Sequence, residues 1–267
     1  MKSPKKITVQ TLQDMKQASE RIAMLTAYDF FSARMFDAAG VDILLVGDTV
    51  GMTLGGHETT LSVSLEQIMY HAEMVSRGVE RSLVVGDMPF LTYQVTIEAA
   101  VENAGHLMQQ GKVHAVKLEG GRTMVPVVKR ILRAGIPVMG HLGLTPQSVH
   151  KFGGWRVQGK DAASAERLRE ASKALEDAGC FAIVLEAIPA DLANEITQSV
   201  EIPTIGIGAG PRCDGQVLTS PDMLGITDFK AKYVKQYANL KQDVIEAVKA
   251  YVDDVKNGEF PTDDLAY

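Results

Sequence analysis

The sequence predicts an α/β protein with the (β/α)8 fold, the TIM barrel, in a single domain that spans residues 1–267. Short apolar runs rich in β-branched residues alternate with longer stretches of helical periodicity, and this alternation is typical of parallel βαβ units. Eight such runs occur, which is the number of strands that closes this kind of barrel. The length of 267 residues also lies within the usual range of one barrel.

The expected strands follow one another along the chain at residues 22–29, 42–48, 82–90, 114–120, 136–143, 181–187, 202–210 and 216–225. The connection from Gly210 to Gly215 is too short for a full helix, so we expect only a turn between the seventh and eighth strands. A doubly wound open sheet has the same alternation and remains an alternative on strand count alone.

Two of the expected helices carry clear start signals. Ser64 and Gln67 have the spacing of a capping box and predict a helix that begins after Ser64. Asp161 is expected to cap the next long helix, which Gly179 ends in the left-handed conformation that glycine adopts easily.

Two further helices fall outside the repeating pattern. Residues 11–20 are expected to form an extra N-terminal helix that closes the N-terminal end of the barrel, and residues from Phe229 to about Asn257 are expected to form a C-terminal helix. The glycine-containing connections at residues 49–63 and 143–160 are longer than turns require, and such loops are usually functional.

Composition and charge exclude several classes of function. The net charge of -6 and the absence of a basic stripe argue against a nucleic-acid partner. The sequence has no apolar run of roughly 18 residues and no apolar region near its start, so we expect a cytoplasmic protein without a membrane span. Cys180 and Cys213 lack CxxC spacing, which argues against a disulfide framework and a structural zinc site.

Three carboxylates occur where apolar strands end, at Asp48, Asp87 and Glu119. Ligands of parallel α/β folds bind at the carboxyl ends of the strands, and the two-residue period of a strand places Lys117 and Glu119 on one face, expected to be the barrel interior. One lysine cannot balance three buried carboxylates, so the pattern predicts a site for Mg²⁺ or Mn²⁺. A lysine–carboxylate salt-bridge network is the alternative.

Glu186 and His141 are the other candidates at strand ends. Glu186 follows the apolar run FAIVL, and apolar surroundings suit a carboxyl group to act as a general base. It could instead cap the following turn at Ile188–Pro189. An isolated histidine such as His141 is more often a structural hydrogen-bonding residue than a catalyst, and the sequence does not decide between these roles.

Several longer motifs occur together in this order: VGDTVGM, GDMPF, VKLEGG, GIPVMGHLGLTPQSVHKFGGWRVQG, AIVLE and PTIGIGAG followed by CDGQVL. From about Ile7 to Leu240 the chain resembles the ketopantoate hydroxymethyltransferase family. The resemblance implies a Mg²⁺-binding barrel that transfers a hydroxymethyl group from methylenetetrahydrofolate to 3-methyl-2-oxobutanoate. The products would be 2-dehydropantoate and tetrahydrofolate, formed through a metal-stabilised enolate in pantothenate and coenzyme A biosynthesis. The family often forms homo-oligomers, commonly decamers.

The resemblance also implies roles for individual residues. The implied metal ligands are Asp48, Asp87 and Glu119, the implied 2-oxoacid contacts are Asp48, Thr49, Asp87 and Lys117, the implied proton acceptor is Glu186, and the position implied to lie near the substrate is His141. Thr49 stands where the family often has serine and keeps the hydroxyl group. Residues 219–221 depart from the family pattern at the end of the eighth strand.

Two rival interpretations belong to other classes. One is a Mg²⁺-dependent carbon–carbon lyase or mutase of the phosphoenolpyruvate mutase and isocitrate lyase type. Those enzymes commonly have a catalytic cysteine in a loop rich in lysine and glycine, whereas Cys180 precedes a strand and Cys213 lies in a tight turn. The other is a non-catalytic barrel that only binds a partner, and the loss of a proposed ligand or of Glu186 would have favoured it. All of these residues are present.

Overall fold

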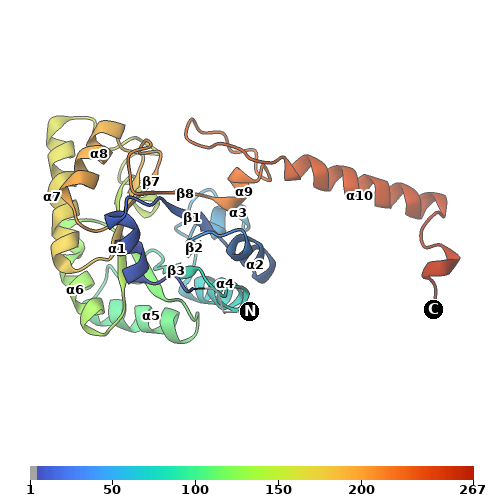
Figure 1. Ribbon diagram of the computed structural model, residues 1–267, viewed down its shortest axis with the longest axis horizontal. Coiled ribbons are helices and arrows are strands. Elements are labelled where there is room, and N and C mark those ends of the chain that lie inside the picture. The colour runs from blue at the N-terminus through green and yellow to red at the C-terminus, as the bar shows by residue number, and fades with distance from the viewer. Residues whose placement is uncertain (1–4) are drawn as a thin grey trace. The chain divides into compact units, whose positions relative to one another are not determined.

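The computed structural model describes residues 5–267, and its central feature is a closed barrel of eight parallel strands in sequence order (Figure 1). The strands are β1 (Ile22–Thr26), β2 (Ile43–Val46), β3 (Leu83–Asp87), β4 (Ala115–Glu119), β5 (Val138–Gly143), β6 (Ala182–Glu186), β7 (Thr204–Ile207) and β8 (Gly215–Leu218). Because β8 pairs with β1, the doubly wound open sheet is excluded and the predicted barrel is confirmed.

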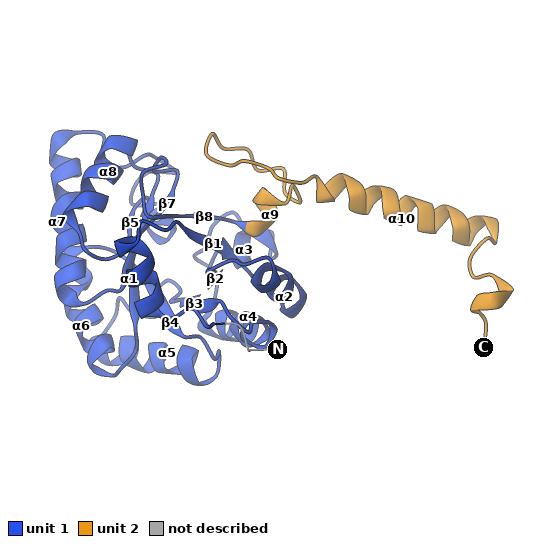
Figure 2. Ribbon diagram, in the orientation of Figure 1, with its two compact units in different colours: residues 1–219 blue, residues 220–267 orange. Residues whose placement is uncertain are grey.

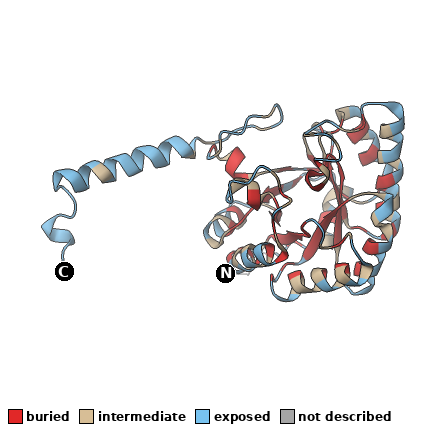
Figure 3. Ribbon diagram, turned by 180° about the vertical axis from the view of Figure 1, so that it is seen from behind, coloured by how far each residue is buried: buried red, intermediate tan, exposed pale blue. Residues whose placement is uncertain are grey.

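Helices connect the strands and surround the barrel. They are α2 (Phe30–Ala38), α3 (Val50–Thr53), α4 (Leu65–Gly78), α5 (Ile97–Gln109), α6 (Val125–Arg133), α7 (Ala162–Ala178) and α8 (Ala190–Ser199), with the short 3-10 helices η1 (Arg122–Met124) and η2 (Pro146–Ser148). Only turns join β7 to β8, as expected. Figure 3 shows buried strands at the centre and exposed outer faces on the helices.

Alternate residues of the strands fill the interior of the barrel. The buried cluster there includes Met24, Leu45, Val85, Met139, Val184 and Val217. The opposite strand face packs against helices: a side chain at Gly86, next to Val85, would meet Leu107 of α5. Asp87 follows Gly86, so the same alternation returns it to the interior.

The extra N-terminal helix is α1 (Val9–Gln17), and it belongs to the barrel core. Its Leu12 is completely buried in one cluster with Ile22 and Ile43, the first residues of β1 and β2. The helix begins earlier than residue 11 because Thr8 and Thr11 form a capping box. The structure confirms that this helix closes the N-terminal end of the barrel.

The predicted caps are also confirmed. Ser64 and Gln67 form a reciprocal capping box at the start of α4. Asp161 caps α7, and Gly179 ends that helix with a φ of 104°.

The chain divides into two compact units, one that ends at Thr219 and one from Ser220 to Tyr267 (Figure 2). The barrel belongs to the first unit. The second contains α9 (Ser220–Met223), α10 (Leu240–Asn257) and the 3-10 helix η3 (Asp263–Leu265). A single catalytic domain over residues 1–267 stays a prediction.

Two boundaries near the C-terminus were predicted wrongly. The eighth strand ends at Leu218 instead of continuing to Gly225, because Pro221 has no N–H for a ladder and fits the first turn of α9. The last helix begins at Leu240 instead of Phe229. The backbone N–H groups of Tyr237 and Leu240 donate to the carbonyls of Met223 and Leu224, which folds the preceding segment back on α9. Of the helices in residues 5–267, none combines the length and apolar character needed to cross a membrane.

Candidate active site

All of the predicted site residues meet at the carboxyl end of the barrel. They line one small cavity of about 50 Å³. The residues are Asp48, Thr49, Asp87, Lys117, Glu119, His141 and Glu186. Strand register accounts for much of this convergence, because Asp87 pairs with Lys117 across β3 and β4, and Glu119 pairs with His141 across β4 and β5. Asp48 and Thr49 follow β2 directly, and Glu186 is the last residue of β6.

Lys117 and Asp87 form a buried ion pair at the centre of this cavity. Lys117 Nζ lies 2.7 Å from Asp87 Oδ1, and the backbone N–H of Asp48 donates to Asp87 Oδ2 at 3.0 Å. Burial alone would lower the pKa of Lys117, but the negative charges of Asp87, Glu119 and Asp48 outweigh it and raise that pKa. Lys117 therefore remains charged and shares the interior face with Glu119, as the strand period predicts.

The carboxylates of the cavity are crowded. Burial, followed by the charges of Asp87 and Glu119, holds the pKa of Asp48 well above its usual range. Burial also raises the pKa of Asp87, although Lys117 opposes the shift. The positive charge near these two carboxyl groups is therefore too small to offset their burial and the negative charges around them.

His141 connects this cluster with Glu186. Its Nδ1 lies 3.3 Å from Lys117 Nζ and 3.5 Å from Glu119 Oε1, and its Nε2 lies 3.2 Å from Glu186 Oε2 without the alignment of a hydrogen bond. Burial and the charge of Lys117 lower the pKa of His141, but Glu119 and Glu186 outweigh them and raise it to about 9. A neutral imidazole would accept from Lys117, whereas this pKa favours the imidazolium paired with the two carboxylates.

Glu186 is not a turn cap. Its side chain is 14% exposed and faces His141, and α8 begins without a side-chain cap. Its carboxylate accepts no backbone N–H within the described part of the chain. The carboxylate is thus available to a molecule in the cavity. At the opposite side, Thr49 Oγ1 lies 2.8 Å from the hydroxyl of Tyr28, which fixes the Thr49 side chain.

Gln147 and Tyr93 organise the carboxylates, and the sequence interpretation missed both. The Gln147 amide donates from Nε2 to Asp48 Oδ2 at 2.9 Å and to the Met88 carbonyl at 3.0 Å, while its backbone N–H donates to Glu119 Oε2 at 3.0 Å. The hydroxyl of Tyr93 donates to Gln147 Oε1 at 2.7 Å and accepts from the Glu119 N–H at 3.1 Å. Gln147 lies inside the GHLGLTPQS motif, but no spacing rule shows that its side chain turns toward Asp48.

The donor chemistry fits a divalent cation, although the side-chain positions do not form a metal site. Four carboxylates and two cations, Lys117 and His141, leave two negative charges when all are ionised, and one divalent ion balances them. Yet among residues 5–267 no three Asp, Glu, His or Cys side chains are placed to hold one ion. Lys117 and Gln147 occupy carboxylate oxygens instead. A cation would have to replace some of these contacts.

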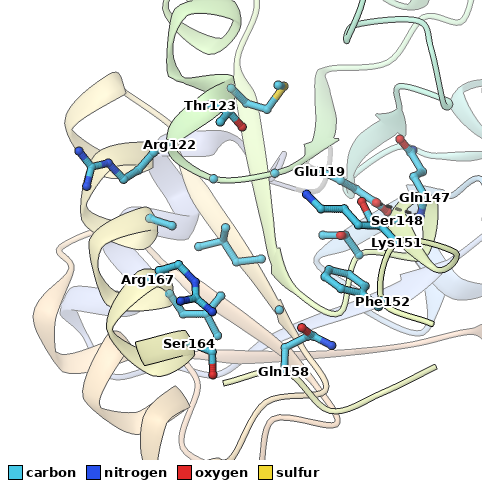
Figure 4. Close-up of a pocket in the computed structure, with 18 of the residues that line it drawn as sticks. Glu119, Arg122, Thr123, Gln147, Ser148, Lys151, Phe152, Gln158, Ser164 and Arg167 are labelled. Atoms are coloured by element: carbon cyan, nitrogen blue, oxygen red, sulfur yellow. Dashed lines mark hydrogen bonds between the residues drawn. The ribbon is translucent and has the colours of Figure 1, made fainter. Parts of the chain in front are cut away.

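A second, larger pocket of about 590 Å³ adjoins the cavity, since Glu119 lines both (Figure 4). Its walls come from the loops that follow β3, β4 and β5 and from the first half of α7. The long 143–160 connection contributes Lys151 and Phe152 to these walls. That this connection is functional stays a prediction.

The two cysteines are not candidates for catalysis. Cys180 and Cys213 are free and buried, and neither lines the cavity. Burial raises the pKa of the Cys180 thiol to about 12 and also raises that of Cys213, so both remain protonated. This removes the nucleophile that the lyase alternative commonly uses.

A (β/α)8 barrel with buried acids, a lysine and a histidine at the carboxyl ends of its strands has the construction of an enzyme. The description of the protein-family model that matches residues 6–263 is ketopantoate hydroxymethyltransferase. The chain belongs to that family and is a transferase.

Curated relatives agree with this assignment over nearly the whole chain. The 3-methyl-2-oxobutanoate hydroxymethyltransferase of Chlorobium phaeobacteroides (strain BS1) is 53% identical over 98% of this chain and 96% of the relative. The protein of the same name from Syntrophus aciditrophicus (strain SB) is 52% identical over 98% of this chain and 97% of the relative.

Solved structures resemble the fold at low sequence identity. Phosphonopyruvate hydrolase in complex with oxalate and Mg²⁺ has a TM-score of 0.62 at 12% identity, covering 97% of this chain and 90% of that chain. A 2,3-dimethylmalate lyase of the phosphoenolpyruvate mutase/isocitrate lyase superfamily has a TM-score of 0.59 at 17% identity, covering 97% and 91%. These likenesses show the barrel fold alone, so they do not support the lyase alternative as a function.

Proposed function

We propose that this chain transfers a hydroxymethyl group from methylenetetrahydrofolate to 3-methyl-2-oxobutanoate, as the names of its relatives indicate. Water supplies the hydroxyl oxygen, and the products are 2-dehydropantoate and tetrahydrofolate. The observation that carries the proposal is the position of Glu186, which faces His141 at 3.2 Å in the same cavity as the three carboxylates expected to hold Mg²⁺.

The proposed metal ligands are Asp48, Asp87 and Glu119, and their crowded, buried carboxylates are the support for a cation there. A bound Mg²⁺ would act as a Lewis acid that polarises the ketone oxygen of the oxoacid and acidifies the neighbouring C3–H bond. Asp48, Thr49, Asp87 and Lys117 are the proposed contacts of the oxoacid itself.

Glu186 is the proposed base. Its carboxylate takes the C3 proton, and the electron pair of that bond moves into the enolate of the oxoacid. His141 donates no aligned hydrogen bond to Glu186, so the Glu186 oxygen that lies 3.2 Å from His141 Nε2 is free to accept the proton. Lys117 balances the negative charge of the oxoacid or of the enolate. Water cleaves the two C–N bonds that hold the one-carbon unit, which leaves tetrahydrofolate and a C=O group at the formaldehyde level. The enolate carbon then adds to the carbon of this group, and its oxygen takes a proton and becomes the new hydroxyl group.

Product formation tests the proposal. Wild-type protein supplied with Mg²⁺, methylenetetrahydrofolate and 3-methyl-2-oxobutanoate should form 2-dehydropantoate, detected by mass spectrometry. Glu186→Gln should lower the rate at least about a hundredfold, as expected for loss of a general base. Glu166→Gln, an exposed change on α7, is the matched control and should leave the rate unchanged. No product from the wild-type protein would contradict the proposed reaction.

Calorimetry with Mg²⁺ separates the metal site from the lysine–carboxylate network. Asp87→Asn removes one negative charge, so it should weaken Mg²⁺ binding about tenfold or more. Unchanged affinity would favour the network. A cytoplasmic location, expected from the lack of a long apolar run in the sequence, remains a prediction. Assembly into a homo-oligomer, in the family commonly a decamer, is a prediction that follows from the resemblance.

A further inference from the structure

We propose that the pocket of about 590 Å³ beside the acidic cavity is the binding site of the reduced folate, with Lys151 and Arg167 recognising the carboxylates of its glutamate tail. This inference rests on the proposed function, because that function requires a folate next to the oxoacid. It assigns a place to the second substrate, which the cavity of about 50 Å³ is too small to hold.

Size and position are the first argument. A pocket of roughly 300–1,000 Å³ is typical for a ligand of the size of a folate. Glu119 lines both the pocket and the cavity, so a molecule in the pocket reaches the cavity beside this residue. The one-carbon unit lies in the middle of the folate, between its pteridine and its benzoyl group. This middle part of the folate must therefore lie near Glu119, with the pteridine on one side of it and the glutamate tail on the other.

The walls of the pocket suit flat rings. Gly120 and Gly121 leave the backbone uncovered, and a side chain at either would come within 2.8 Å of Met124 or Ala171, respectively. Phe90 also lines the pocket and exposes 37% of its surface, so its ring can pack against a flat ring in the pocket.

The rim carries positive charge. Arg122, Lys151 and Arg167 all line the pocket, and Figure 4 shows Lys151 drawn beside Ser148 and Gln147, with Arg122 and Arg167 at the opposite side. Arg122 pairs with Glu170 at 2.8 Å. Within residues 5–267, Lys151 and Arg167 form no side-chain ion pair. Two cations without a direct ion-pair partner at the rim are complementary to the two carboxylates of a glutamate.

Calorimetry of tetrahydrofolate binding tests the inference, performed with the wild-type protein in the presence of Mg²⁺ and 3-methyl-2-oxobutanoate. The double variant Lys151→Gln/Arg167→Gln should bind about tenfold more weakly, the loss expected for two partly exposed charge contacts. Arg130→Gln is the matched control, because Arg130 is an exposed arginine of α6 outside the pocket. It should bind tetrahydrofolate as the wild type does.

Tetrahydropteroate, which lacks the glutamate, identifies the part of the folate that the cations contact. Wild type and double variant should bind it equally. Equal binding of tetrahydrofolate to both proteins, or an equal loss of both ligands in the double variant, would overturn the assignment. If instead the wild type fails to exchange the C3 proton of the oxoacid with solvent, the proposed function fails and not the folate site alone.

Discussion

Replacing Gln147 by leucine tests whether one buried amide organises the acidic centre. Leucine has nearly the volume of glutamine, so the change removes polar contacts without opening a large cavity. It leaves Asp48 Oδ2 and the Met88 carbonyl without the donor that now lies 2.9 Å and 3.0 Å away, respectively. Tyr93 keeps a partner, since its hydroxyl also lies 3.2 Å from the Glu119 carbonyl.

Two buried acceptors without donors at about 1–3 kcal/mol each should lower the free energy of unfolding of Gln147→Leu by about 3 kcal/mol. Loss of the Gln147 hydrogen bond should also raise the pKa of Asp48 further, because that bond favours the carboxylate. Urea unfolding of the metal-free protein, followed by circular dichroism, measures the change. Gln110→Leu, an exposed change at the end of α5, should stay within about 0.5 kcal/mol of wild type. A Gln147→Leu variant as stable as this control would refute the role of the amide.

Two other predictions concern charge and packing. The folded-state pKa of His141, about 9, lies above its ordinary value of 6.5, so the metal-free folded protein holds a proton that the unfolded chain releases. The resulting stabilisation, about 3 kcal/mol at most, should be complete below pH 6.5 and disappear as the pH rises through 9. Urea unfolding at several pH values should show this slope in the wild type and a smaller one in His141→Asn; equal slopes would contradict it. Leu12→Ala should lower the free energy of unfolding by about 2–5 kcal/mol, because Leu12 is fully buried at the closed end of the barrel. Leu54→Ala, at a residue 56% exposed, should have little effect, and similar losses for both would mean that α1 does not close the core.

The positions of the site residues could be predicted because they depend on short-range rules. Strand periodicity places Lys117 and Glu119 on one face, and parallel strands bring their carboxyl ends together. Asp48 and Asp87 could therefore be assigned to one site from the amino-acid sequence alone. The barrel core follows from the same alternation of apolar residues.

The connections between these residues could not be predicted, because they depend on how loops fold back. Gln147 reaches Asp48 across 99 positions of sequence, and Tyr93 reaches Gln147 across 54. The charge of His141 depends on its distances from Glu119 and Glu186, which no sequence spacing contains. The start of the last helix was missed for a similar reason, since the backbone bond from Tyr237 to Met223 outweighs a helical pattern in residues 229–239.

Deuterium exchange at C3 of 3-methyl-2-oxobutanoate tests the central claim most directly, because it isolates proton removal from the folate step. With Mg²⁺ and without folate, wild-type protein in D2O should replace the C3 proton, and NMR should show the loss of its signal. Glu186→Gln should abolish this exchange while Mg²⁺ affinity, measured by calorimetry, remains. Wild-type exchange no faster than background would contradict Glu186 as the base, and a matching loss of Mg²⁺ affinity in Glu186→Gln would make it a metal ligand instead.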